Sequence, residues 1–249
     1  MPRRFDAVLC DVDGCLGPEE SSPLDASGLA LVAAHNRRAA EAGDVPMVTV
    51  CTGRPAGFAE AISRLISNTA LPLVCENGVW MYDPVRNVWE MDPAIRPEHL
   101  QMVREAVAWA EHTLVPMGVS IQPGKVASMS LYHPDTEMLR SMMPGLEAAF
   151  DDRLWPLRVS MTMRWINCDL VHVSKASGVE RWMASTGLSR DRVAGIGDTM
   201  SDVAIAERVG FFGCPANAVE GLRARAHLVA REREVRGVLE ILEAISRGR

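Results

Sequence analysis

Two carboxylates lie one residue apart near the start of the chain, in the segment Asp11-Val12-Asp13-Gly14. They follow the apolar run 5–10, which is typical of a short buried strand that ends at a turn glycine. Side chains alternate along a strand, so Asp11 and Asp13 could both face a site beyond its carboxyl edge, where open α/β sheets bind ligands. One carboxylate can attack phosphorus as a covalent nucleophile while the second moves the proton. The pair is therefore suited to phosphoryl transfer.

Two further pieces follow in the order that such chemistry needs. Thr52-Gly53-Arg54 comes directly after a second apolar run, where a hydroxyl and free backbone N–H groups form a site for a phosphate oxygen. Lys175 begins a helix-like segment after a returning strand, and its ammonium could hold both Asp11 and a transferring phosphoryl group. Only two of the 26 basic residues are lysines, which favours a position that needs a compact ammonium.

The last piece is the segment 197–202, Gly-Asp-Thr-Met-Ser-Asp, which follows another strand-like run. Asp198 and Asp202 are four residues apart across a helix start, so both carboxylates could converge on one cation. Mg²⁺ prefers such hard oxygen ligands, together with water and substrate phosphate. Helix capping by Asp198 is a second interpretation, and capping and metal binding do not exclude each other.

The elements that must position these residues alternate regularly at both ends of the chain. Strands are predicted at 5–11, 46–51, 71–75, 192–196, 210–213 and 227–230. Helices are predicted at 25–42, 55–68, 175–187, 200–208, 218–225 and 235–247. Because single helices separate the strands, we expect a parallel sheet with right-handed crossovers, a Rossmann-like α/β core.

The pattern changes after about Asn77. A hairpin is predicted from 78–82 and 87–91, then a helix at 96–114, strands at 118–122 and 125–132, a helix at 135–149 and strands at 156–162 and 166–173. We interpret this stretch as an inserted α+β domain. The expected domains are a core formed by residues 1–79 and 174–249, and an insertion at residues 80–173.

Composition limits the class of protein. The chain has 249 residues and is 48% hydrophobic, enough for a core domain with a smaller insertion. No apolar run approaches the roughly 20 residues that span a bilayer, and the N-terminus lacks the apolar stretch of a signal peptide. A net charge of −6 and the lack of a basic cluster argue against nucleic acid as a partner. We expect a cytoplasmic monomer or homodimer without a membrane partner, and six reduced cysteines.

Together the four pieces resemble the motifs of the haloacid dehalogenase (HAD) superfamily, in the same order. The insertion after the third strand, the Glu76-Asn77-Gly78 segment and the later run 215–218, Pro-Ala-Asn-Ala, are similar to its Cof-like and sugar-phosphate phosphatase branch. The resemblance covers essentially the whole core and, more loosely, the cap. It implies a Mg²⁺-dependent phosphatase for a small phosphorylated metabolite. The expected substrates are a sugar phosphate or a phosphorylated carboxylic acid such as phosphoglycolate or a glycosyl-phosphoglycerate.

The resemblance also implies roles for the candidate residues. Asp11 would form an aspartyl-phosphate, and Asp13 would protonate the leaving oxygen and then activate water. Thr52 would donate a hydrogen bond to the phosphoryl group, and Lys175 would neutralise its charge. Four residues would hold Mg²⁺, directly or through another ligand: Asp11, Asp13 through its backbone carbonyl, Asp198 and Asp202.

Other positions bear on substrate choice and on redox behaviour. Cys15 stands where the family usually has threonine, and Ser201 stands where this branch often has asparagine. Neither removes a group that the mechanism requires, although a Cys15 thiol close to the site would make activity sensitive to oxidation. The cap would close over the site, with Lys125 and Arg164 as candidate substrate selectors. Three more residues are expected to contact the substrate: Gly53, Arg54 and Asn77.

Three other functions compete with the phosphatase. A phosphosugar mutase of the phosphomannomutase type would share the aspartyl-phosphate and return the phosphoryl group to the sugar, but the cap motifs expected of such enzymes are missing. A signalling receiver module would carry its phosphorylated aspartate after the third strand, whereas Asp11 follows the first. A catalytically dead scaffold is disfavoured because all four motifs retain their functional groups.

Overall fold

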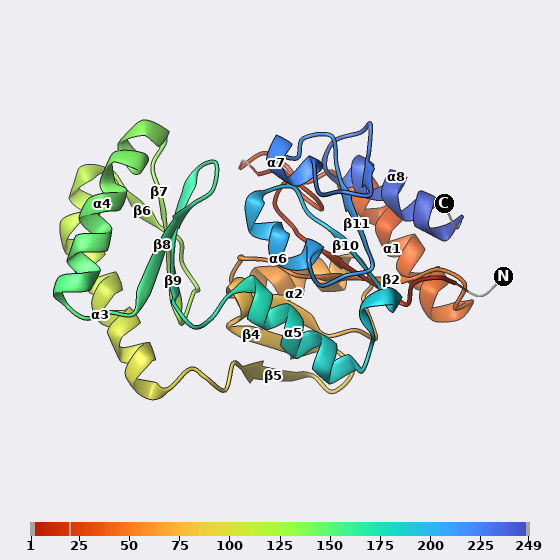
Figure 1. Cartoon of the computed structure of the whole chain (residues 1–249), viewed down its shortest axis with the longest axis horizontal. Coiled ribbons are helices and arrows are strands. Elements are labelled where there is room, and N and C mark those ends of the chain that lie inside the picture. The colour runs from red at the N-terminus through yellow and green to blue at the C-terminus, as the bar shows by residue number, and fades with distance from the viewer. Residues whose placement is uncertain (1–2, 20, 248–249) are drawn as a thin grey trace. The chain divides into compact units, whose positions relative to one another are not determined.

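A computed structural model describes residues 3–19 and 21–247 of the chain (Figure 1). The chain divides into two compact units, which we call the core unit (Met1–Glu90 with Lys175–Arg249) and the inserted unit (Met91–Ser174). The predicted fold class is confirmed, because a parallel sheet forms the centre of the first unit and an antiparallel sheet with helices forms the second.

A five-stranded parallel sheet runs through the core unit in the order β12-β11-β10-β1-β2. β1 lies between β10 and β2, and its last residue Cys10 pairs with Ile196 on one side and Val50 on the other. The carboxyl ends of these three strands therefore meet at one edge of the sheet. The bounds of the strands are β1 Ala7–Cys10, β2 Met47–Val50, β10 Val193–Ile196, β11 Phe211–Cys214 and β12 Leu228–Val229.

Helices cover both faces of this sheet because its strands are apolar on both sides. Val8 and Cys10 belong to the hydrophobic cluster that includes side chains of α1, α2 and α8. The intervening Ala7 and Leu9 belong to a second cluster with α5, α6 and α7. Burial on both faces is typical of a parallel sheet. The helices are α1 Ala26–Glu41, α2 Ala56–Leu65, α5 Lys175–Thr186, α6 Val203–Ala206, α7 Glu220–Arg223 and α8 Glu234–Ser246.

The hairpin predicted within the insertion is grouped, as far as Glu90, with the core unit. β3 (Leu73–Cys75) touches the end of β2 through the parallel bridge between Cys51 and Val74, and pairs antiparallel with β4 (Trp80–Asp83), which β5 (Val88–Met91) follows.

Two kinds of contact hold the hairpin there. Trp80 and Trp89 pack against the first hydrophobic cluster, and Arg181 of α5 donates to the backbone oxygens of Gly78 (2.8 Å) and Glu90 (3.3 Å). The compact units therefore divide after Glu90 and not at the expected position 79/80.

The inserted unit has a four-stranded antiparallel sheet in the order β6-β7-β9-β8. Its elements are α3 Pro97–Thr113, the short 3₁₀ helix η2 Val115–Met117, β6 Ser120–Ile121, β7 Ser128–Tyr132, α4 Thr136–Asp152, β8 Leu157–Met161 and β9 Trp165–Leu170. The side chains of β7 and β9 alternate between the two faces of this sheet. Met129 and Leu131 share one face with Ile166 and Cys168, and all four are buried.

Some predicted elements are shorter in the structure. The helix expected at 200–208 begins as a 3₁₀ turn, η4 (Met200–Asp202), and continues as α6 only to Ala206. The remaining 3₁₀ helices are η1 Glu76–Gly78 and η3 Arg190–Arg192. Within residues 3–19 and 21–247, no helix combines the length and the apolar character that crossing a membrane requires. All six cysteines are buried and free of disulfides.

Candidate active site

Asp11 is the first residue beyond β1. Its backbone N–H donates to the carbonyl of Ile196 (3.0 Å), so the pairing with β10 extends one residue past the strand. The Asp11 carboxylate accepts the N–H of Val12 through Oδ1 (2.8 Å), and its Oδ2 lies 3.1 Å from Nζ of Lys175. The side chain is buried. A carboxylate held at both oxygens has a fixed direction, which suits a nucleophile.

Lys175 is the first residue of α5 and joins two acidic segments. Its ammonium lies 3.1 Å from Asp11 and donates to Oδ1 of Asp202 at 2.7 Å. Burial alone would lower the pKa of this lysine, but the two carboxylates hold the pKa well above its usual value. Lys175 therefore remains a buried cation between the carboxylates of Asp11 and Asp202.

Both carboxylate oxygens of Asp202 are engaged by the protein. While Oδ1 accepts from Lys175, Oδ2 accepts the backbone N–H groups of Asp198 (3.0 Å) and Thr199 (3.1 Å). Asp202 thus fixes the turn that follows β10 and orients the lysine. Asp202 also belongs to the group of three carboxylates, with Asp11 and Asp198, whose nearest oxygens lie within 4.8 Å of one another.

The carboxylate of Asp198 has an oxygen that could bind a metal ion. Its Oδ1 is buried and has no hydrogen-bond partner among the residues that the structure describes, while Oδ2 accepts a long hydrogen bond from Asn217 (3.4 Å). An unpartnered buried carboxylate oxygen is costly, and a divalent cation would satisfy it. The site therefore fits a hard cation such as Mg²⁺.

The electrostatics of the site point to the same conclusion. Burial, together with the nearby Asp202, raises the pKa of Asp11 to about 8 and the pKa of Asp198 to about 9. One ammonium cannot balance three buried carboxylates, so the site retains protons unless further positive charge is bound.

The loop after Asp11 approaches Asp198 very closely. Gly14 adopts a left-handed backbone conformation with φ of +71°, and a Cβ placed on it would lie 1.9 Å from Oδ2 of Asp198. Glycine is required here for both reasons. The turn is closed by the N–H groups of Cys15 (3.1 Å) and Gly17 (2.8 Å), which both donate to the carbonyl of Val12.

Asp13 is engaged by Arg54 in a two-pronged ion pair. Nε of Arg54 donates to Oδ2 at 2.7 Å and a terminal nitrogen donates to Oδ1 at 2.6 Å. The hydrogen bonds to Asp13 raise the pKa of Arg54, whose guanidinium also lies over the ring of Phe58 at 5.0 Å. Sequence reasoning expected Arg54 to contact substrate; the structure places it on the candidate acid.

Thr52, Gly53 and Asn77 meet at the adjacent loop. Thr52 is buried, its N–H donates to Val74 (3.0 Å), and its carbonyl accepts the N–H of Asn77 (3.1 Å). Asn77 has a left-handed φ of 51°, and its side chain would lie 2.9 Å from a Cβ placed on Gly53. The backbone at Gly53 is therefore closely approached, and the three residues are brought together.

Cys15 is buried beside the site and is unsuited to oxidation. Burial raises the pKa of its thiol well above the usual value, with Cys10 as the next contributor. Because the thiolate is the reactive form, this environment does not support the expected redox sensitivity.

The two candidate selectors lie in the inserted unit. Lys125 precedes β7 and donates to Oγ of Ser130 at 2.5 Å, which in turn donates to Oδ1 of Asn167 at 2.6 Å. Arg164 lies in the turn between β8 and β9. Their roles in substrate selection remain predictions.

Sequence reasoning did not assign two residues that the structure places near the site. Asn217 follows β11 and donates to the carbonyl of Gly14 at 2.8 Å. Glu19 is the second, because burial and the nearby Asp13 raise its pKa to about 7. The signal for Asn217 was its place in the run 215–218 just after a strand of the parallel sheet, although no role was assigned to it, and no sequence pattern singled out Glu19.

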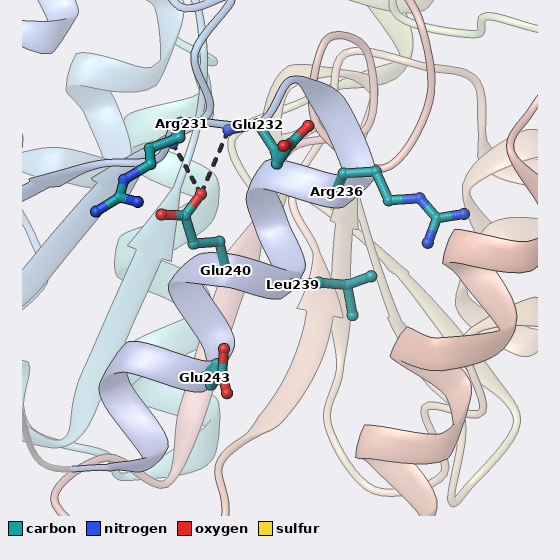
Figure 2. Close-up of a pocket in the computed structure, with 6 residues that line it drawn as sticks. All are labelled: Arg231, Glu232, Arg236, Leu239, Glu240 and Glu243. Atoms are coloured by element: carbon teal, nitrogen blue, oxygen red, sulfur yellow. Dashed lines mark hydrogen bonds between the residues drawn. The ribbon is translucent and has the colours of Figure 1, made fainter.

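A surface pocket on α8 differs in character from the acidic site. Figure 2 shows its lining: Arg231, Glu232, Arg236, Leu239, Glu240 and Glu243. The backbone N–H groups of Arg231 (2.8 Å) and Glu232 (3.3 Å) donate to Oε2 of Glu240, as the dashed lines mark. Its mostly exposed side chains of both signs are typical of a solvated surface, and none of them was a predicted site residue.

Parts of the chain are similar in sequence to known proteins. Residues 121–242 match the family model of haloacid dehalogenase-like hydrolases. A phosphoglycolate phosphatase of Aeropyrum pernix is 38% identical over 74 residues, which cover 30% of this chain and 31% of that protein. The match thus spans about a third of the length of this curated relative.

Solved structures share the fold along nearly the whole chain. A haloacid dehalogenase-like hydrolase from Bacteroides thetaiotaomicron aligns over 97% of this chain and 99% of its own, with a TM-score of 0.70 and 15% identity. The sucrose-phosphatase of Synechocystis aligns over 98% of both chains, with a TM-score of 0.66 and 14% identity. The chain is therefore similar to haloacid dehalogenase-like hydrolases in sequence over residues 121–242, and it shares its fold with such proteins over nearly its whole length.

Proposed function

We propose that the chain is a Mg²⁺-dependent phosphatase that hydrolyses a small phosphorylated metabolite through an aspartyl-phosphate on Asp11. The observation that carries the proposal is the buried carboxylate of Asp11, held by Lys175 beside the unpartnered Oδ1 of Asp198. These groups provide a nucleophile, a fixed cation and a place for a second cation, which is what phosphoryl transfer requires.

Mg²⁺ would be held by carboxylate oxygens of Asp11 and Asp198 and by the backbone carbonyl of Asp13. We infer that Asp202 acts indirectly, because Lys175 and two backbone N–H groups already occupy its oxygens. When bound, the ion supplies positive charge to the phosphoryl oxygens and relieves repulsion among the carboxylates.

In the first step an oxygen of Asp11 attacks phosphorus, a new O–P bond forms, and the P–O bond to the leaving group breaks. Asp13 gives its proton to the leaving oxygen. In the second step Asp13 takes a proton from water, the water oxygen attacks phosphorus, and the bond to Asp11 breaks, which releases phosphate. Lys175 and Thr52 stabilise the phosphoryl oxygens through both steps.

The Asp13–Arg54 ion pair adds a requirement to these reaction steps. Asp13 accepts hydrogen bonds from Arg54 at both oxygens, so neither oxygen is open to a leaving group. Asp13 must therefore separate from Arg54 before it can donate a proton. We propose that the negative charge of an arriving phosphoryl group competes for the guanidinium and frees the acid.

The identity of the substrate is a separate part of the proposal. The partial relative from Aeropyrum pernix is a phosphoglycolate phosphatase, which makes phosphoglycolate the first substrate to test, before sugar phosphates and glycosyl-phosphoglycerates. Lys125 and Arg164 are proposed to select the substrate's non-phosphate part, so replacing Lys125 with methionine should raise KM more than it lowers kcat.

The test is phosphate release from this panel with Mg²⁺ or with EDTA, for the wild type and Asp11→Asn. Release that needs Mg²⁺ and vanishes in the variant supports the proposal. Folded wild-type protein that releases no phosphate from any member contradicts it, and transfer of the phosphoryl group to another position of the sugar would favour the mutase.

A further inference from the structure

Asn217 connects three segments of the core unit that are distant in sequence. Its Nδ2 donates to the carbonyl of Gly14 at 2.8 Å and to Oδ2 of Asp198 at 3.4 Å. Its Oδ1 accepts the backbone N–H of Glu234 at 2.8 Å, at the start of α8. One side chain therefore links the loop after β1, the loop after β10 and the first residue of α8.

These partners fix which way the amide of Asn217 points. A backbone N–H can only donate and a backbone carbonyl can only accept, so the oxygen must face Glu234 and the NH₂ must face Gly14. With that orientation the NH₂ also faces the carboxylate of Asp198. The backbone holds the segment in place, because Val219 N–H donates to the carbonyl of Asp198 at 2.8 Å.

The same contacts determine which oxygen of Asp198 is available. Oδ2 is covered by Gly14, where no Cβ could fit, and is bound by Asn217. Oδ1 is buried and accepts no hydrogen bond from any residue within 3–19 and 21–247. The carboxylate can thus offer one oxygen to a cation while the other is held by the protein, which is how groups behind a metal ligand orient it.

We propose that Asn217 is a positioning residue that directs Oδ1 of Asp198 toward the cation. The inference rests on the proposed metal-dependent function and extends it to a residue outside the four motifs. It predicts that Asn217 acts on metal affinity, because it touches the ligand and the nucleophile loop, and has little effect on kcat once the site is saturated with metal.

The experiment measures Mn²⁺ binding by electron paramagnetic resonance, without substrate, in the wild type and Asn217→Ala. The loss of a group that orients a metal ligand typically weakens metal affinity 10- to 100-fold, and the long contact to Asp198 places the expected loss at about tenfold. The Mg²⁺ concentration for half-maximal activity should rise by a similar factor, with kcat at saturating Mg²⁺ nearly retained.

Asn36→Ala is the matched control. Asn36 is a buried asparagine of the same unit whose amide also makes three hydrogen bonds, all of them to backbone, with Val48 (2.7 and 3.0 Å) and Ile66 (2.8 Å). Its loss should lower stability and leave the Mn²⁺ affinity unchanged. If Asn217→Ala does not fold, Asn217→Ser replaces it, because a serine side chain is too short to reach both partners.

Unchanged Mn²⁺ affinity in a folded Asn217 variant would overturn the inference, and so would an equal loss in Asn36→Ala. Failure of the proposed function would look different, because the wild type itself would then bind no Mn²⁺ and release no phosphate.

Discussion

Replacing Lys175 with methionine should destabilise the core unit in a way that depends on pH. The lysine side chain is 5% exposed and its ammonium contacts Asp11 at 3.1 Å and Asp202 at 2.7 Å. Methionine fills a similar volume but leaves two buried carboxylates without that cation. Removing one partner of a buried ion pair costs about 3 to 5 kcal/mol of the free energy of unfolding.

The size of this loss should grow as the pH rises. The pKa of Asp11 is already raised to about 8, and it rises further when the ammonium is gone. An acid whose pKa is raised in the folded state stabilises the fold at low pH, and that stability is lost as the pH increases toward the raised pKa. At about pH 5 Asp11 is protonated in both proteins, whereas at about pH 9 the wild type ionises it beside Lys175 and the variant must keep the proton or ionise the buried acid without a cation, at a cost in stability.

The assay is urea unfolding of the metal-free protein, followed by tryptophan fluorescence at both pH values. We expect the urea midpoint of Lys175→Met to fall further below that of the wild type at the higher pH. With Mg²⁺, kcat should decrease by about 10²- to 10³-fold, the usual effect of removing one group that stabilises developing charge. Arg38→Met is the control, because its ion pair with Asp44 is exposed and should contribute little. Equal midpoints for variant and wild type at both pH values would refute this reasoning.

Three further predictions follow from the same geometry. Because the pKa values of Asp11 and Asp198 are raised to about 8 and about 9, Mg²⁺ binding at neutral pH should release up to about two protons, and fewer as the pH rises through these values. Calorimetry in buffers of different ionisation enthalpy measures this, and a buffer-independent enthalpy would contradict it. Gly14→Ala should weaken Mg²⁺ binding at least about tenfold, because the new Cβ meets Asp198. Gly43→Ala has a similar φ of +67° with no heavy atom within 4 Å of the new Cβ, so it should bind Mg²⁺ normally, and equal losses in both would rule out the steric cause. Finally, the native protein should resist alkylation of Cys15 by N-ethylmaleimide, since the thiol is buried and its pKa is raised. Mass spectrometry that finds rapid modification of folded protein would show that the thiol is accessible.

Residue type and strand position were enough to predict the acidic centre of the site. Asp11 and Asp198 directly follow, or nearly follow, strands that pair side by side, so parallel-sheet topology brings them together. The scarcity of lysine singled out Lys175, which lies between Asp11 and Asp202.

Contacts that depend on exact side-chain geometry could not be predicted in this way. The pair between Arg54 and Asp13 could not be predicted, because only the folded loops show that the guanidinium reaches that carboxylate, and the expected contact of Arg54 with substrate stays a prediction. The hairpin of β4 and β5 was assigned to the insertion because its local pattern changes there, although packing of Trp80 and Trp89 joins it to the core unit. Local pattern does not reveal which neighbour a hairpin packs against.

Chemical trapping of the covalent intermediate tests the central claim most directly. The protein would be mixed with Mg²⁺ and p-nitrophenyl phosphate, quenched, and reduced with borohydride, which converts an aspartyl-phosphate to homoserine. Peptide mass spectrometry should locate homoserine at position 11, only when both Mg²⁺ and substrate are present, and should find unmodified aspartate at position 13. Turnover of the substrate without any modification of Asp11, or modification at another carboxylate, would contradict the proposed mechanism.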